Sequence, residues 1–257
     1  MNRQSNMQVS VCMATYNGRH FIEEQLNSIF PQLSAEDELI ISDDHSTDGT
    51  WEFLLALAKR DPRIKLFQND QQGLIKNFEN AIKQSTKALI FLCDQDDVWH
   101  KDKVETTVRY FADPKIQVVV SDLIIVDNDF EVLVPSYQAM RHTRPGFWAN
   151  LLKSSYIGAG MAFRSELKAV ILPIPKEVPM HDMWIGLLAD YHKGVKFISE
   201  PLVYYRRHGL NASEIKTTAS RMQQFKWRWN AFQLVRKRVK EIKEKQQKHF
   251  SNNKHQV

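Results

Sequence analysis

Three aspartates fall within four residues directly after an apolar run in the middle of the chain. The run is ALIFL (88–92), and Asp94, Asp96 and Asp97 follow it in the segment CDQDDVWHKDK. Neighbouring carboxylates repel each other, so such a cluster needs either a cation or full solvation. Mg²⁺ and Mn²⁺ are commonly held by one or two carboxylates together with substrate phosphates. The cluster therefore fits a metal–diphosphate site, and a solvated turn before a helix fits it equally well.

A second pair of acids, Asp43 and Asp44, ends the apolar run ELIISDD and precedes the turn HSTDG. A carboxylate at this place can accept a hydrogen bond from an N–H of a nucleobase. Capping of the next helix accounts for Asp48, but it does not account for two acids before the turn. In the segment ATYNG, Tyr16 offers an aromatic face for a base, although an ordinary strand-to-helix loop has the same composition.

Two later segments contain candidates for proton transfer. The segment VPMHDMW places Asp182 before an apolar helix expected over residues 183–191. The pair His181 and Asp182 can act as a catalytic acid or base, or Asp182 can cap that helix. His208, in YRRHG, is one of nine histidines and by itself fits a surface position in a basic loop.

The elements that must position these residues alternate along the first 130 residues. Strands are expected at 9–16, 38–44, 88–94 and 117–127, and helices at 21–30, 50–59, 74–84 and 102–111. Near-continuous apolar strands that alternate with helices predict an α/β fold, with a mostly parallel sheet covered by helices on both faces. Ligands of such sheets bind beyond the carboxyl ends of the strands, where the unusual polar segments of this chain fall.

Composition sets the remaining bounds. The chain has 257 residues, of which 43% are hydrophobic, enough for one α/β domain with an extension. We expect a domain over residues 1–215 and a tail over 216–257. Cys12 and Cys93 lie in apolar runs and predict buried free thiols in a reducing compartment. No apolar stretch reaches the roughly 18 residues of a spanning helix, so we expect a cytoplasmic protein, peripheral on the inner face of a membrane.

The positive charge is concentrated in the tail. Residues 220–257 carry 11 Lys and Arg against 2 Asp and Glu, although the whole chain has a net charge of only +5. The body is therefore mildly acidic, which gives no indication of nucleic-acid binding. Residues 221–245 predict one amphipathic helix whose apolar stripe runs from Phe225 to Ile242. A basic amphipathic helix suits a membrane surface, and packing on its own domain or a dimer contact explains the pattern equally well.

Taken together, these segments resemble the family 2 glycosyltransferases, which transfer a sugar from a nucleotide diphosphate donor on a GT-A fold. The resemblance covers roughly residues 8–213, and its segments appear in the family's order. They are VSVCMATYNG, ELIISDDHSTDGT, NDQQGLIKNFENA, FLCDQDDVWHKDK, GAGMAF, MHDMW and YRRHGLNAS. The HDMW and YRRHG forms are most similar to the rhamnosyltransferase-like branch. One departure is Ala14, where many members have Pro.

The resemblance implies a role for each matching residue. Those in the donor pocket would be Thr15, Tyr16, Asn17, Asp43, Asp44, Asn69, Lys76, Asp94 and Gln95. A divalent cation, Mn²⁺ or Mg²⁺, would be held by Asp94, Asp96 and His208, with Asp96 as the direct ligand. Asp182 would be the catalytic base that takes the proton of the acceptor hydroxyl, in one displacement that inverts the anomeric centre.

The implied activity is transfer of a sugar to a glycan or lipid-linked acceptor in the synthesis of a surface polysaccharide such as O-antigen or capsule. A carboxylate facing N3–H of a pyrimidine cannot distinguish uracil from thymine, so UDP-sugars and dTDP-rhamnose both remain open as donors. One alternative is a nucleotidyltransferase, although ATYNGRHF lacks the Gly-rich basic loop expected for a triphosphate. The other is a catalytically dead module that binds a nucleotide or glycan.

Overall fold

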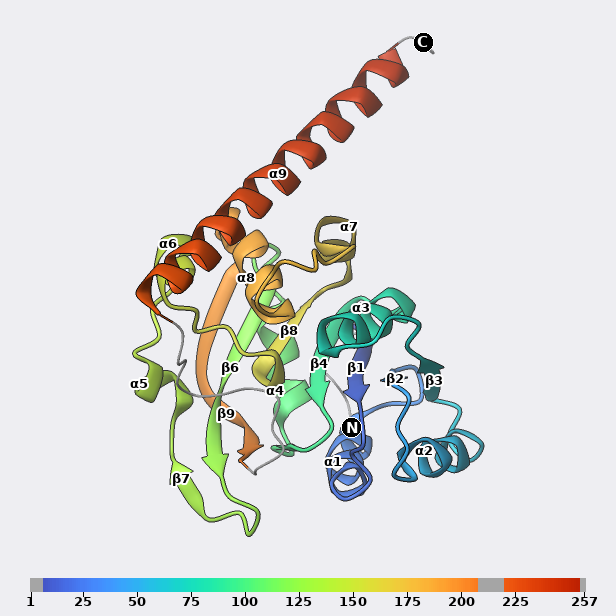
Figure 1. The fold of residues 1–257 in the computed structure, drawn as a ribbon. Coiled ribbons are helices and arrows are strands. Elements are labelled where there is room, and N and C mark those ends of the chain that lie inside the picture. Colours follow the sequence, from blue (N-terminus) through green and yellow to red (C-terminus); the bar gives the residue numbers. More distant parts are fainter. Residues whose placement is uncertain (1–6, 208–219, 255–257) are drawn as a thin grey trace.

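The computed structural model describes residues 7–207 and 220–254, and within these residues nine strands form one curved sheet (Figure 1). The strands are β1 (Val9–Thr15), β2 (Glu38–Asp43), β3 (Ile64–Gln68), β4 (Leu89–Asp94), β5 (Val98–Trp99), β6 (Val118–Val126), β7 (Val132–Val134), β8 (Met161–Arg164) and β9 (Val195–Arg206). The order is β3-β2-β1-β4-β8-β6-β9-β5, and β7 pairs with β6 outside this path.

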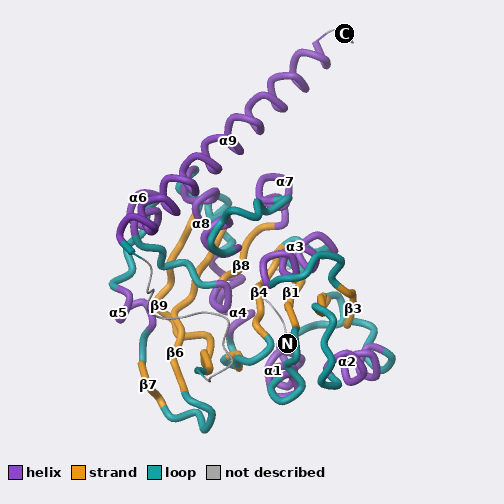
Figure 2. Tube along the Cα trace, viewed as in Figure 1, coloured by secondary structure: helices purple, strands orange, loops and turns teal. Residues whose placement is uncertain are grey.

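Helices cover both faces of the sheet (Figure 2). They are α1 (Ile22–Ile29), α2 (Thr50–Ala58), α3 (Leu74–Gln84), α4 (Lys103–Tyr110), α5 (Tyr137–Arg141), α6 (Phe147–Leu152), α7 (Lys168–Ile171), α8 (His181–Tyr191) and α9 (Arg221–Lys254), with short 3₁₀ turns at Phe30–Gln32, Gly158–Gly160 and Ser165–Leu167. One core joins α3, α8 and α9 to the sheet, and the other joins α1, α2 and α4 to its opposite face. Alternate residues of β1 enter the two cores: Cys12 packs in the first and Met13 in the second.

The parallel half of the sheet positions the acidic segments. β1 lies between β2 and β4, and both pairs are parallel. Thr15 is therefore level with Asp43, and Ala14 with Asp94, so the acids that end β2 and β4 meet beside the end of β1. The predicted α/β fold, with helices on both faces, is confirmed. The segment 154–163 favours a loop followed by a strand, and that strand is β8, which runs antiparallel between β4 and β6 and carries Met161 to Arg164 into the same sheet.

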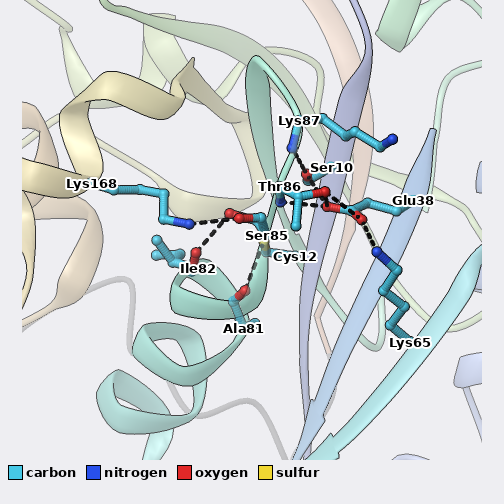
Figure 3. A network of polar contacts seen from close by, with 10 residues as sticks. All are labelled: Ser10, Cys12, Glu38, Lys65, Ala81, Ile82, Ser85, Thr86, Lys87 and Lys168. Carbon is cyan, nitrogen blue, oxygen red and sulfur yellow. Dashed lines mark hydrogen bonds and ion pairs between the residues drawn. The ribbon is translucent and has the colours of Figure 1, made fainter. Parts of the chain in front are cut away.

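A polar network connects the parallel strands at their other end, away from the acidic segments (Figure 3). The Glu38 carboxylate accepts hydrogen bonds from Ser10 Oγ (2.7 Å), Thr86 N (2.6 Å) and Lys65 Nζ (2.5 Å). Burial acts to raise the pKa of Glu38, but these hydrogen bonds outweigh it and leave the pKa below its usual value. The network therefore ties β1, β2, β3 and the turn before β4 together at the end away from the acidic cluster.

The last helix is both packed and projecting. Ala231, Val235 and Val239 of α9 are buried in the core that includes α8, whereas the C-terminal part of the helix extends away from the body (Figure 1). The helix continues to Lys254 rather than ending near residue 245. The proposed boundary at 215/216 falls in residues 208–219, outside the described part of the chain, and stays a prediction. No helix among the described residues has the length and apolar character needed to cross a bilayer.

Candidate active site

The carboxyl ends of β1, β2 and β4 open into one cavity of about 900 Å³. Its wall includes seven of the residues that the sequence indicated for a site. These are Thr15, Tyr16, Asp44, Asp94, Gln95, Asp96 and Asp182. The far wall comes from α5, α6 and the first turns of α9, with Tyr137, Leu152 and Trp227. The cavity therefore joins the ends of the parallel strands to the C-terminal helix.

The three aspartates after β4 have different environments. Asp94 and Asp96 line the cavity. Asp97 turns away from it into the core, where its Oδ1 accepts a hydrogen bond from Arg206 N at 3.1 Å. Asp97 therefore links the acidic segment to β9, and the Asp-x-Asp pair faces the cavity.

The chemistry of this pair suits a divalent cation. Burial, together with the negative charges of Asp96 and Asp182, raises the pKa of Asp94 from 3.8 to about 7. A cation beside Asp94 would remove this repulsion, and one or two carboxylates are a usual protein contribution to a Mg²⁺ or Mn²⁺ site. Among the described residues, no three His, Cys, Asp or Glu side chains gather as a metal site. The predicted third ligand, His208, lies outside the described residues.

Two buried side chains brace the acidic segment from behind. Lys103 of α4 donates to Ala159 O at 2.5 Å and lies 4.2 Å from the centre of the Trp99 ring. Burial lowers the pKa of Lys103 to about 8, and its positive charge acts to lower that of Asp94. Gln25 of α1 donates from Nε2 to Asp94 O at 3.0 Å. The hydrogen bond of Gln25 therefore holds the backbone at the end of β4, and the charge of Lys103 offsets part of the negative charge there.

Gln95 connects the loop after β1 to the acidic segment. Its side chain accepts from Tyr16 N and donates to Tyr16 O, both at 2.9 Å. A Cβ added at Gly18 would lie 2.1 Å from Gln95 Oε1, so only glycine leaves room for this pairing. The Tyr16 side chain is 57% exposed and lines the cavity. Its ring is therefore available to stack against a ligand.

Asp44 lies in the cavity wall, held by its neighbours. Asn69 Nδ2 donates to Asp44 Oδ1 at 2.9 Å, and Gly73 N donates to Oδ2 at 2.8 Å. Asp43 is fully buried and accepts hydrogen bonds from Thr15 Oγ1 (2.8 Å) and Ser46 Oγ (2.6 Å). Asn69 and Asp43 therefore shape the loop that presents Asp44, and neither appears in the cavity wall.

Asp182 reaches the same cavity from α8. The helix begins at His181, so Asp182 lies in its first turn and is not the N-cap that its position suggested. Its carboxylate accepts from Gly158 N (3.0 Å) and Met183 N (2.5 Å). Burial raises its pKa to about 6, against the lowering effect of these hydrogen bonds. At neutral pH Asp182 is mostly ionised and can accept a proton.

Two further predicted residues lie beside the cavity wall. Asn17 has φ 47°, and its Oδ1 accepts from Thr47 N at 2.9 Å, which joins the loops after β1 and β2. Lys76 Nζ pairs with Glu79 at 2.7 Å and donates to Ile174 O at 3.1 Å. Direct contact of these residues with a donor stays a prediction.

The structure adds wall residues that the sequence did not single out. Asn77 lines the cavity and donates to Thr15 O at 3.0 Å, and Gly158 is both a wall residue and a partner of Asp182. His181, which the sequence indicated together with Asp182, also lines the cavity and stacks on Phe78, and it is neutral because burial lowers its pKa to about 3. The two glycines of GAGMAF were the only signal for this part of the wall.

The comparison with known families gives the same assignment as the motifs. The sequence profile described as glycosyl transferase family 2 matches residues 10–170. The chain belongs to this family. An uncharacterized glycosyltransferase of Nostoc sp. is 27% identical over 229 residues, covering 86% of this chain and 71% of the relative. The dTDP-rhamnosyl transferase RfbG of Shigella flexneri is 39% identical over 102 residues, covering 37% of this chain and 35% of RfbG.

Solved glycosyltransferases share the fold. Staphylococcus aureus TarS 1–349, crystallised with UDP, superposes with a TM-score of 0.63 at 21% identity, covering 78% of this chain and 61% of TarS 1–349. The mannosyltransferase PcManGT of Pyrobaculum calidifontis, crystallised with GDP-Man and Mn²⁺, gives 0.59 at 23% identity, covering 78% of this chain and 56% of PcManGT. The GT-A fold expected from the sequence is confirmed.

Proposed function

We propose that this chain is an inverting, metal-dependent glycosyltransferase that uses a dTDP- or UDP-sugar. The observation that carries the proposal is the meeting of Asp44, Asp94, Asp96 and Asp182 in one cavity. The name of RfbG, a dTDP-rhamnosyl transferase, and the UDP bound in the TarS crystal support a pyrimidine nucleotide donor. The acceptor is a glycan or a lipid-linked glycan, and the process is synthesis of a surface polysaccharide.

Each part of the cavity has one task in this account. Asp44 accepts a hydrogen bond from the base, and Asn69 and Gly73 hold the Asp44 carboxylate in its orientation. The exposed ring of Tyr16 stacks on the nucleoside, and Gln95 keeps its loop in place. Asp94 and Asp96 would hold Mn²⁺ or Mg²⁺, which would neutralise the charge of the diphosphate leaving group.

The reaction is one displacement at the anomeric carbon. The acceptor oxygen forms a bond to that carbon, and the bond from the carbon to the diphosphate oxygen breaks. Asp182 Oδ takes the proton of the acceptor hydroxyl, and the nucleoside diphosphate leaves with the electron pair of the broken bond. Because one displacement occurs, the configuration at the anomeric carbon inverts.

We place the enzyme in the cytoplasm. The support is that Cys12 and Cys93 are buried free thiols, as is usual in a reducing compartment. Family membership argues against the nucleotidyltransferase alternative. Release of UDP or dTDP from a panel of nucleotide sugars, with water as the acceptor and with and without Mn²⁺, tests the proposal. Metal-dependent release from one donor supports it, and release from none favours the dead binding module.

A further inference from the structure

An exposed aromatic surface lies on α6 and α9, beside the cavity wall that these helices form. It consists of Trp148 and Leu152 of α6 with Met222, Phe225 and Trp229 of α9, which we call the aromatic surface. Phe225 is 61% exposed and Trp229 is 56% exposed. Isolated exposed apolar residues are ordinary, whereas a cluster of large ones at one place indicates a binding surface.

The aromatic surface is joined to the body by ring contacts. Phe232 of α9 packs against Trp148 with ring centroids 5.5 Å apart and against Trp229 at 6.0 Å. One turn further on, Val235 is fully buried against the domain. The surface is therefore held in a fixed position relative to the cavity.

The two chain segments that carry the aromatic surface have charge of one sign. Residues 137–155 and 221–240 together carry ten Lys and Arg and no Asp or Glu, although the whole chain has a net charge of only +5. Outside these two segments the chain is acidic overall. A two-fold dimer through this surface would bring the same cations face to face, which is unfavourable. An anionic surface is the complementary partner.

The aromatic surface is continuous with the cavity. Leu152 belongs to both, and Trp227 and Arg228 of α9 lie in the cavity wall. Arg141 also lines the cavity; its Nη2 donates to Ser154 O at 2.9 Å, and its buried Nε has no partner among the described residues. Of the wall carboxylates, Asp44, Asp94 and Asp96 lie at or shortly after strand ends, and Asp182 belongs to α8. A phosphate near Arg141 and Arg228 would meet cations, at the same edge as the aromatic rings.

We propose that the aromatic surface docks on an anionic lipid bilayer and sets the mouth of the cavity at the level of the lipid headgroups. Aromatic rings favour the membrane interface, and Lys and Arg beside them are attracted to anionic lipids. The sugar of a lipid-linked acceptor then reaches Asp182 from the α6–α9 side, with its phosphate beside Arg141 and Arg228. This last step rests on the proposed function, whereas docking does not.

Sedimentation of the full chain with sucrose-loaded vesicles tests the docking. We expect binding to phosphatidylcholine vesicles that contain about 30% phosphatidylglycerol, weaker binding at high salt and little binding to phosphatidylcholine alone. The double variant Phe225→Ser and Trp229→Ser should lose most of the binding to these vesicles. The matched control is Val132→Ser with Leu133→Ser on β7, which removes side chains that are 56% and 55% exposed and lie outside the two basic segments.

A charge pair tests the electrostatic part and serves if the aromatic variant fails to fold. Arg144→Glu with Lys226→Glu should weaken vesicle binding more than about tenfold, because each cation near an anionic surface contributes roughly fivefold. Lys101→Glu with Lys115→Glu changes the net charge equally, at exposed positions on another face, and should have a smaller effect.

Three results would overturn the docking. The first is that the wild-type chain does not bind anionic vesicles. The second is that the test and control variants lose equal amounts of binding. The third is that the chain binds no vesicles and forms a dimer in sedimentation velocity, which the double variant Phe225→Ser and Trp229→Ser dissociates. Nucleotide affinity, measured on the same variants, separates this proposal from the proposed function. Docking that fails while UDP or dTDP still binds leaves the transferase assignment intact.

Discussion

Asp182→Asn and the pH dependence of turnover test the role of Asp182 as base. The pKa of Asp182 is raised from 3.8 to about 6, so the carboxylate is about nine-tenths ionised at pH 7 and about one-tenth at pH 5. We therefore expect kcat, measured with saturating donor and Mn²⁺, to be about tenfold lower at pH 5 than at pH 7. An aspartate with its ordinary pKa would still be more than nine-tenths ionised at pH 5, and kcat would hardly change.

The variant gives the second half of this test. Removal of a general base costs about 10²- to 10⁴-fold in turnover, so Asp182→Asn should reduce kcat by that amount. The new amide keeps one acceptor oxygen, so one of the hydrogen bonds from Gly158 N and Met183 N is lost. That loss costs about 1–3 kcal/mol, partly offset by removal of a buried charge, and the protein should still fold. Donor affinity measured at both pH values serves as the control. A flat kcat between pH 5 and 7, or full activity of Asp182→Asn, would refute the assignment.

Three further sets of variants test other parts of the structure. Folding raises the pKa of Asp94 from 3.8 to about 7, so the metal-free protein loses stability as pH rises from about 4 to about 7 and the full loss is present at pH 8. Asp94→Asn should therefore stabilise it at pH 8 by about 2 kcal/mol in thermal unfolding, half of the ~4 kcal/mol that the shift implies, since water in the cavity screens the charge. Lower stability of the variant would contradict this sign. Gly18→Ala and Gln95→Ala should each weaken nucleotide binding in calorimetry, because both disturb the pairing of Gln95 with Tyr16. The double variant should therefore bind the nucleotide no more weakly than the single variant with the lower affinity. Additive losses of binding free energy would argue against a shared pairing. Val235→Ala should lower the free energy of unfolding, measured with denaturant, by about 2 kcal/mol, because Val235 is buried. Phe225→Ala should lower it by under about 0.5 kcal/mol, because Phe225 is exposed. Equal effects would mean that α9 does not pack as described.

The fold was predictable because its signals are local. The helix predicted over residues 74–84 is α3, and the strand predicted at 38–44 is β2 without its last residue. The position of Asp44 and Asp94 at one edge followed from the rule for parallel sheets, since β1 pairs with both neighbouring strands in parallel. The end of α9 was not predictable, because the polar sequence after residue 245 carries no apolar stripe.

The finer roles within the site depend on contacts between distant segments. Asp43 and Asp44 are alike in sequence, yet Asp43 is buried against Thr15 and Ser46 while Asp44 faces the cavity. Gln25 supports Asp94 across 69 positions of sequence, and no local pattern marks it. Such pairings become visible only once the elements are placed side by side.

The most direct measurement of the central claim is calorimetric titration of the wild-type chain and Asp96→Asn with UDP, dTDP, GDP and ADP, with and without Mn²⁺. We predict that UDP or dTDP binds the wild-type chain tightly only when Mn²⁺ is present, and that Asp96→Asn loses the effect of the metal. Binding that is equal with and without Mn²⁺ in both proteins, or no binding of any nucleotide, would contradict the assignment of the cavity as a metal-dependent nucleotide-sugar site.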